Sequence, residues 1–498
     1  MAIMDVIAEK SDKLMPEISA DIIIEKPKVF LKKRISLFQC VSIIVGIIVG
    51  SGIFVSPVGI TAQVQSVGMS LVMWGVVGLY STLCALCYAE LGASLPESGG
   101  EYVYIRHAWG DFAAFLCLWM NMVIISPACV AAASLIFASY ILKMVFINCE
   151  PPEQPVKLIA FLIIALVIVV NWYNVNWATK LQVVITSCKL LALLTIVIIG
   201  FYTLGQGNTE NFKDAFEGSD YSAGAISIAF YCGFWAYGGW NYLNFLTEEV
   251  IKPHRNLPLG VIISIPIVTV IYITVNVAYF SVLTPMEMLQ SSAVAVTFLE
   301  RTVRSLSYVI PVMISISVVG SINGAVLGMS RLFCVAARNN HLPLIFSMVH
   351  IHTSIPRPSF LIMFIFVVLM QMFGDIFLLI EMMGFCLSIV LTLVFSGQVL
   401  MRRTKPNLSR PIKLPWILPV VLCLSSLAIL ITTVYQKPSE SCLALMVVAC
   451  GLPAYLLGSK CRKPQYIQRV IDQATRILQI LMQVYPPDKQ GSKETTRN

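Results

Sequence analysis

The chain has 498 residues, of which 57% are hydrophobic and only 12% are charged. A soluble globular protein averages roughly 45–50% apolar and about 25% charged residues, so these few charges cannot cover a water-facing surface. The net charge of +8 comes from basic residues scattered through short loops, which argues against a nucleic-acid-binding patch. The composition therefore indicates a membrane protein.

Apolar runs close to the membrane-spanning length of about 20 residues recur along the whole chain. They predict an all-α membrane protein with a transporter-sized domain at 36–460, an N-terminal tail at 1–35 and a C-terminal segment at 461–498. We predict twelve spanning helices, near residues 37–62, 68–95, 111–146, 156–176, 181–204, 222–250, 258–283, 305–335, 358–374, 376–401, 414–435 and 440–459.

Loop charges indicate the orientation of these spans. Basic residues precede the first span and recur in alternate loops, for example at Arg106, Lys180 and Arg402. Because basic loops stay on the cytoplasmic side, we expect both termini in the cytoplasm. The one glycosylation sequence, Asn407-Leu408-Ser409, then falls on the cytoplasmic side, where it would not be used.

Residues 466–485 show a different pattern, with apolar residues at helical spacing and Arg469, Asp472 and Arg476 between them. This pattern predicts an amphipathic helix. Two interpretations stay open: the helix lies on the inner membrane face, or it packs on the protein's own loops.

The first and sixth predicted spans contain glycines that a plain spanning helix does not need: Gly46, Gly50, Gly52, Gly233, Gly238 and Gly239. Glycine costs about 1 kcal/mol inside a helix but lets the backbone leave it. Small residues can also serve only to let helices pack closely. Their matching positions, first in spans one to five and first in spans six to ten, favour two broken helices of an inverted-repeat transporter.

A broken helix offers groups that suit a zwitterion. Free N–H groups at the start of a half-helix carry partial positive charge and hold a carboxylate. Carbonyl groups at the end of the preceding half-helix hold an ammonium group. Ser51 adds a hydroxyl donor, and Trp235 can stack over a bound side chain.

Lys189 and Glu381 lie within predicted spans, and ionisable groups inside a membrane are functional candidates. The Lys189 ammonium is predicted to replace a sodium ion that would tie span one to span eight; the alternative is a lysine that points into a water-filled vestibule. Glu381 is either a proton or cation site, or a protonated group that bonds to a neighbouring helix. The residues alone do not separate these alternatives.

At these residues the chain resembles the light subunits of heteromeric amino acid transporters, in the amino acid–polyamine–organocation superfamily. The likeness covers about residues 30–488, and its specific motifs are GSGIFVSP at 50–57, AELGASLPESGGEY at 89–102 and AYGGWNYLNFLTEE at 236–249. The resemblance implies a twelve-span LeuT-type fold with a 5+5 inverted repeat and broken helices 1 and 6. It also implies sodium-independent exchange of amino acids across the plasma membrane by alternating access, without a cofactor.

The resemblance assigns site residues. The substrate carboxylate would meet the backbone at Ser51 and Gly52, and the amino group would meet carbonyls near Ile48 and at Trp235 and Gly238. The whole substrate-binding set is Ile48, Gly50, Ser51, Gly52, Ile53, Trp235, Gly238, Asn241 and Tyr242. Lys189 matches the family's lysine at the sodium-like position.

The resemblance also implies a partner. Cys149 matches the cysteine that forms a disulfide to a single-span glycosylated heavy chain, which is rBAT-like or 4F2hc-like in this family. The loop that holds Cys149 is external in the predicted topology, where disulfides persist. Cys442 is the nearest alternative for this bond.

Departures from the family pattern bear on the substrate. The cystine and dibasic exchanger has an aspartate where this chain has Gly238, and several relatives have a basic residue where it has Ser126. Met383 and Leu387 stand where large-neutral transporters carry phenylalanine and asparagine. We therefore expect neutral, bulky substrates, as in the aromatic-preferring members of the family.

Other functions are weighed against this one. A cystine and dibasic exchanger is supported by Trp235 and opposed by Gly238, and a proton-coupled uniporter or symporter would use Glu381. A chaperone-like partner without transport is opposed by the intact glycine motifs. An enzyme is not expected, because the five histidines form no triad-like or HExxH pattern.

Overall fold

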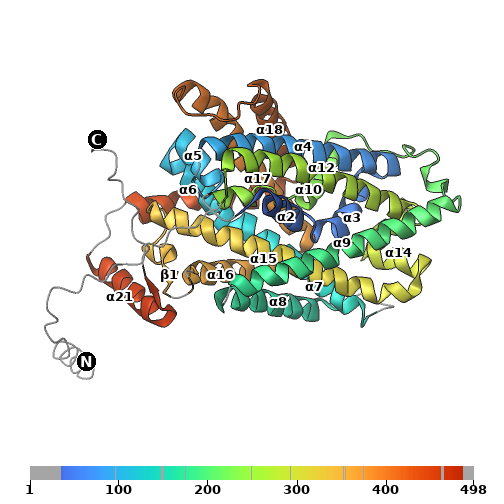
Figure 1. Cartoon of the computed structure of the whole chain (residues 1–498), viewed down its shortest axis with the longest axis horizontal. Coiled ribbons are helices and arrows are strands. Elements are labelled where there is room, and N and C mark those ends of the chain that lie inside the picture. Colours follow the sequence, from blue (N-terminus) through green and yellow to red (C-terminus); the bar gives the residue numbers. More distant parts are fainter. Residues whose placement is uncertain are drawn as a thin grey trace. The chain divides into compact units, whose positions relative to one another are not determined.

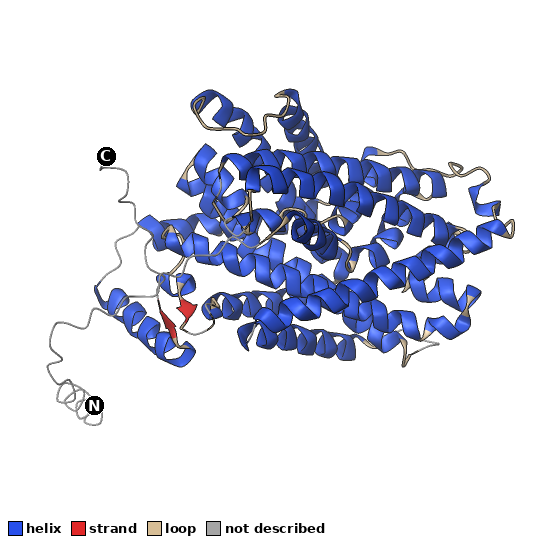
Figure 2. Cartoon of the chain, in the orientation of Figure 1, coloured by secondary structure: helices blue, strands red, loops and turns tan. Residues whose placement is uncertain are grey.

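The computed structural model describes residues 35–485, apart from residues 96, 147–150, 174, 248–249, 292, 352, 354, 374 and 461–464. Helices make up nearly all of the described chain, and they run side by side in one compact bundle (Figures 1 and 2). Cys149 lies outside the described residues, so its predicted disulfide stays a prediction.

Nine helical segments within the described residues are long and apolar enough to cross a membrane. Three of them consist of joined elements, and the rest are single helices. They are α4 (Val67–Ser94), α6 (Asp111–Met120) with η1 (Asn121–Ile125) and α7 (Ser126–Lys143), α8 (Glu153–Tyr173), α9 (Val175–Gly205), α12 (Pro253–Phe280), η4 (Arg304–Ser307) with α15 (Val309–Arg338), α17 (Ile376–Thr404), α18 (Ile417–Gln436), and α19 (Pro438–Ala449) with α20 (Gly451–Tyr455).

The first span is a tenth segment that is broken in its middle. It consists of α2 (Leu37–Ile48) and α3 (Gly52–Val64), which are bent by 50°. Two shorter apolar helices, α10 (Ala223–Ala236) and α16 (Arg357–Phe373), lie in the predicted sixth and ninth spans. The chain is thus a helical, multi-pass membrane protein, while the count of twelve spans and the 5+5 repeat stay predictions.

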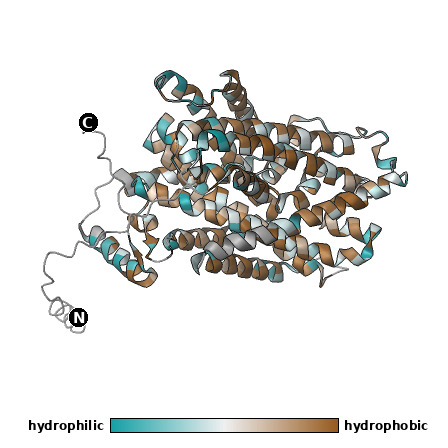
Figure 3. Ribbon diagram, in the orientation of Figure 1, coloured by the Kyte–Doolittle hydropathy of each residue, from teal (hydrophilic) through white to brown (hydrophobic). Residues whose placement is uncertain are grey.

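The helices of the bundle consist mostly of hydrophobic residues (Figure 3), and many large apolar side chains are exposed on them. On α8, for example, the exposed side chains Leu158, Leu162, Leu166 and Val169 recur at helical spacing and form a stripe that faces away from the bundle. Apolar side chains exposed in such numbers fit a lipid environment and not water.

Short elements connect the spans. They are α5 (Glu101–Trp109), η2 (Glu210–Phe212), α13 (Pro285–Leu289), α14 (Val294–Thr302), η5 (Leu344–Ser347) and β1 (Val349–His350), whereas α11 (Tyr242–Phe245) follows α10 within the predicted sixth span. Near the C-terminus, α21 (Gln465–Met482) is followed by β2 (Val484–Tyr485), which pairs antiparallel with β1. The amphipathic helix therefore ends before residue 485, because the last residues are taken up by this strand pair.

One edge of α21 packs on the protein itself. Leu478 and Met482 contact a small apolar cluster that contains Ile345 and Met348 of the loop between α15 and α16. Other apolar side chains of α21, including Ile480 and Leu481, are exposed. The packing interpretation thus applies to one edge of the helix, and the opposite apolar edge is left facing outward.

A buried ion pair joins α4 to α17. Arg402 donates to both carboxylate oxygens of Glu90 at 2.8 Å, and the Leu414 N–H donates to the same carboxylate at 2.9 Å. Glu90 is almost completely buried, and these three hydrogen bonds compensate its charge.

Candidate functional site

The backbone leaves the helical conformation at both predicted breaks. Helix α2 ends at Ile48, where Val49 turns to an extended conformation with ψ 91°, and α3 begins at Gly52. Helix α10 ends at Ala236 and α11 begins at Tyr242, with Gly239 between them at φ +117°. A positive φ of this kind is strained for any residue with a side chain, so glycine is required there.

Glycines also let the two breaks touch. A methyl group added at Gly52 would overlap the backbone of Ala236, and one added at Gly50 would overlap the Ser321 side chain on α15. The start of α3 therefore lies directly against the end of α10, and the first break lies against α15. This close approach explains why small residues stand in both motifs.

A cavity lies between the two breaks and is closed on its other sides by α7, α15 and α17. It holds about 730 Å³ of empty space, open solvent at its mouth included. The residues around it are Ile47, Ile48, Gly50, Ser51, Gly52, Cys129, Val130, Ala133, Phe234, Trp235, Ala236, Gly238, Gly239, Asn241, Tyr242, Ser321, Ile322, Ala325, Met383 and Leu387.

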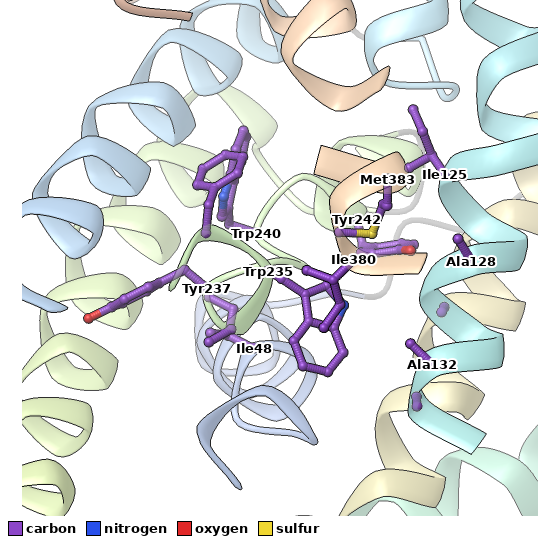
Figure 4. Close-up of a cluster of buried hydrophobic side chains, with 14 of the residues drawn as sticks. Ile48, Ile125, Ala128, Ala132, Trp235, Tyr237, Trp240, Tyr242, Ile380 and Met383 are labelled. Atoms are coloured by element: carbon purple, nitrogen blue, oxygen red, sulfur yellow. The ribbon is translucent and has the colours of Figure 1, made fainter. Parts of the chain in front are cut away.

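Most of the predicted site residues thus come together at one cavity. Figure 4 shows Trp235, Tyr242 and Met383 in the same cluster as Ile48 of α2 and Ala128 of α7. Three of the predicted substrate-binding and pocket residues, Ile53, Ser126 and Glu381, do not line the cavity. Ile53 is buried one position beyond it in α3, and Ser126 is buried at the start of α7, one turn before Cys129.

Sequence reasoning missed the contributions of α7 and α15. Cys129 and Ala133 lie four residues apart on α7, and Ser321 and Ala325 lie four apart on α15. Small residues at this spacing share one helix face and leave room beside it. That spacing is the only signal in the sequence, and it is common in any packed membrane helix.

The first break presents unpaired backbone donors. Within the described residues, the N–H groups of Gly50, Ser51, Gly52 and Ile53 donate to no other group. They stand at the start of α3, where the helix dipole adds partial positive charge. The arrangement can therefore hold an anion such as a carboxylate.

The carbonyl groups at the breaks already have partners. The Tyr272 hydroxyl on α12 lies 2.7 Å from the Ile48 oxygen and 3.1 Å from the Ala236 oxygen. The Trp235 oxygen accepts from the Gly238 N–H at 3.0 Å. Each carbonyl has a second lone pair, so these contacts leave one acceptor position per oxygen.

Lys189 is completely buried in α9 and reaches the first break. Its ammonium group donates to the Gly46 and Val49 carbonyl oxygens, at 2.7 Å in the second case. These two carbonyls stand at the end of α2, where a cation complements the helix dipole. The side chain bonds to the protein and does not point into a vestibule.

Glu381 has a partner that sequence reasoning did not consider. Its carboxylate lies 3.5 Å from the Lys437 ammonium, in the short connection between α18 and α19. Glu381 does not line the cavity. The ion pair with this half-exposed lysine is a third interpretation of Glu381. The two earlier ones are a free proton site and a carboxyl group bonded to a neighbouring helix.

Comparison with known proteins adds an independent observation. The family model described as amino acid permease matches residues 35–451. The chain belongs to this family. It is 41% identical to the human cystine/glutamate transporter over 462 residues. This alignment covers 93% of this chain and 92% of the transporter.

Two further relatives align with this chain over most of their length. The mouse b(0,+)-type amino acid transporter 1 is 39% identical over 460 residues, or 92% of this chain and 94% of that one. The mouse large neutral amino acids transporter small subunit 2 is 38% identical over 476 residues, or 94% and 89%. The chain therefore belongs to the same permease family as these three relatives, which are amino acid transporters by name.

Proposed function

We propose that this permease exchanges neutral amino acids, aromatic ones included, across the plasma membrane by alternating access and without sodium. The observation that carries the proposal is the lining of the cavity, in which no charged side chain occurs among the described residues. A charged substrate side chain would meet no counter-charge there, and burying an unpaired charge is expensive. A zwitterion is different, because the backbone at the breaks can bind both of its charged groups.

The backbone geometry supports this binding mode. The unpaired N–H groups from Gly50 to Ile53 suit the substrate carboxylate, and the Ser51 hydroxyl adds a donor. The remaining lone pairs of the Ile48 and Trp235 oxygens suit the ammonium group. Asn241 and Tyr242 complete the wall.

The side-chain end of the cavity favours bulky apolar groups. Phe234 and Trp235 offer aromatic surface, and Met383 and Leu387 offer flexible apolar surface. This lining supports a preference like that of the aromatic-preferring transporter Arpat, which the sequence resembles.

Sodium independence rests on Lys189. A fixed ammonium group at the Gly46 and Val49 carbonyls occupies the place in which a cation would otherwise bind to the end of α2. A mobile sodium ion is then not needed to stabilise the first break.

Exchange of cystine or dibasic amino acids is the second candidate, and it comes from the names of the relatives. The human relative is named a cystine/glutamate transporter, and one mouse relative is named a b(0,+)-type amino acid transporter. Against this candidate stands the uncharged lining, with Gly238 at the position of the family's aspartate. A proton-coupled transporter that uses Glu381 is less supported, since Glu381 pairs with Lys437 away from the cavity.

Efflux of preloaded amino acid from liposomes that contain the full chain tests the function. Preloaded tyrosine should leave when tyrosine, phenylalanine or leucine is added outside, and it should stay when buffer alone is added. Sodium should have no effect. Strong exchange of arginine or glutamate would overturn the neutral substrate class, and efflux into amino-acid-free buffer would overturn exchange.

A heavy chain, rBAT-like or 4F2hc-like, is part of the proposal, since one relative is a small subunit by name. Cys149 is proposed as its disulfide partner. In native membranes, Cys149→Ser should remove a high-mass band that reducing agent also removes. Cys442→Ser is the matched control, because Cys442 is an exposed cysteine near the same predicted face. Loss of the band in the control alone would move the bond to Cys442.

A further inference from the structure

Glu101 is a buried carboxyl group that the proposed transport mechanism does not use. It is the first residue of α5, and its side chain is almost completely shielded from solvent. Neither of its carboxylate oxygens makes a hydrogen bond of good geometry to any described residue. The loss of solvent on burial raises the pKa of Glu101 by more than its own backbone N–H and the Asn241 and Asn121 side chains lower it, so the buried anion is disfavoured.

The group lies directly behind the wall of the cavity. The amide groups of Asn241 and Asn121 are the side chains that act on the Glu101 carboxyl group. Asn241 lines the cavity, and Asn121 begins the π-helical turn η1 that leads into α7. Glu101 is therefore separated from the substrate cavity by one layer of side chains.

Glu101 also stands on the side of the site that is predicted to be cytoplasmic. Helix α5 lies near the end of α15, where Tyr102 bonds to His341 and Arg106 bonds to Asn339. The loop after α15 carries β1, which pairs with β2 beside α21, and α5 and α21 lie toward the same end of the bundle (Figure 1). Water that enters from the cytoplasm would reach Glu101 before it reaches the substrate.

No cation among the described residues compensates the carboxyl group. The ionisable groups that feel its charge are neutral ones from four elements, namely Tyr88, Tyr104, Cys117 and Tyr242. The charged groups on the elements around it are engaged elsewhere. Arg106 pairs with Asp111 at 2.9 Å, and Arg402 pairs with Glu90.

We propose that Glu101 is a proton-binding site at the cytoplasmic floor of the cavity, and that it must hold a proton for the floor to close. The proposal rests on the proposed function, since it assigns a control to the same transport site. When the floor opens toward the cytoplasm, water solvates the carboxylate and the proton leaves. When the floor closes, the carboxyl group takes a proton back before it is buried. Cytoplasmic pH would then set how readily the transporter completes its cycle.

The direction of the pH effect follows from burial. Desolvation raises the pKa of Glu101 from its ordinary value of 4.5 to about 7. A carboxyl group with a raised pKa stabilises the closed floor fully below pH 4.5, and this stabilisation is lost as the pH rises through about 7. Exchange should therefore slow as the pH is raised across that value.

Liposomes that contain the full chain provide the test, with tyrosine exchange measured at equal internal and external pH across this range. The wild type should slow several-fold toward high pH. Glu101→Gln mimics the protonated group and should exchange at one rate throughout. Glu97→Gln is the matched control, because Glu97 lies on the same segment, is half-exposed and pairs with His107 at 3.4 Å. It should follow the wild-type profile.

A second measurement does not depend on transport. Infrared difference spectra between low and high pH should show a buried carboxyl group losing its proton near the same pH, and the signal should be absent from Glu101→Gln. If nothing is exchanged at any pH but this signal is present, the proposed function fails and the proton site stands. A titration that survives in Glu101→Gln, or a pH-independent wild type that lacks the signal, overturns the proposal.

Discussion

The hydroxyl group of Tyr272 lies 2.7 Å from the carbonyl oxygen of Ile48, the last residue of α2. The same hydroxyl lies 3.1 Å from the Ala236 oxygen, at the end of α10. One completely buried side chain on α12 thus contacts both helix breaks at once. Because a hydroxyl has a single proton, the two carbonyl oxygens share one donor.

The first prediction removes this shared contact. Tyr272→Phe keeps the ring packing and deletes only the hydroxyl, so exchange should fall up to about tenfold, the equivalent of one ordinary hydrogen bond. Tyr237→Phe is the control, since the Tyr237 hydroxyl donates to Trp74 at 3.0 Å and touches neither break. Equal losses in both variants would contradict a special role for Tyr272. Exchange in liposomes is the measurement.

The second prediction concerns the contact between the breaks. Gly52→Ala would place a methyl group in the backbone of Ala236, so α3 and α10 must separate, at a cost of about 1–3 kcal/mol. Exchange should fall more than about tenfold. Gly75→Ala, in the middle of α4, meets only Ile273 at 4.0 Å and should be neutral or stabilise the protein by up to about 1 kcal/mol. An active Gly52→Ala would show that the breaks need not touch.

The third prediction tests the fixed cation. Lys189→Met leaves the Gly46 and Val49 carbonyls without their donor, which costs about 1–3 kcal/mol for each buried acceptor. Exchange should be lost, and the melting temperature in detergent should fall. Lys157→Met is the control, because Lys157 makes only surface contacts among the described residues: the pair with Glu153 and a 3.5 Å contact with the Met372 carbonyl oxygen. Sodium-dependent activity in Lys189→Met would support the sodium-substitute role directly.

The fourth prediction concerns the ion pair between α4 and α17. Glu90→Gln removes one charge and leaves Arg402 buried without its partner, so the free energy of unfolding should fall by about 3–5 kcal/mol. Thermal unfolding in detergent measures the loss. Glu153→Gln, at an exposed pair on α8, should change stability by less than about 1 kcal/mol. Similar melting temperatures for the two variants would contradict the importance of the buried pair.

The last prediction separates Glu381 from transport. Glu381→Gln breaks the pair with Lys437, whose ammonium group is half-exposed, so stability should change by no more than about 1 kcal/mol. The rate and the pH profile of exchange should stay those of the wild type. A flattened pH profile in this variant would return the proton site to Glu381.

Some features of this protein follow from periodicity and composition alone. The long apolar runs predicted the spanning helices well, because a helix in lipid satisfies its backbone within itself and needs no distant partner. The breaks near Gly50 and Gly238 were also predictable, since glycine acts on its own backbone. The family resemblance assigned the residues beside those breaks, and most of them line the cavity.

The side chains that face the cavity from α7 and α15 could not be predicted in this way. Cys129, Ala133 and Ser321 look like any small residue in a packed membrane helix. The partners of the buried ionisable groups were equally hidden. Glu381 seemed to be the titratable group of interest, yet it has Lys437 beside it, whereas Glu101 seemed to be only part of a loop motif.

The sequence by itself determined the membrane class, the positions of the helices and the two places where the backbone departs from them. These depend on interactions within about one helical turn, which local residue types control. Only the tertiary structure decided which charges are paired and which are not. Pairing joins residues such as Glu90 and Arg402, which lie far apart along the chain, and only the folded arrangement of helices brings them within reach.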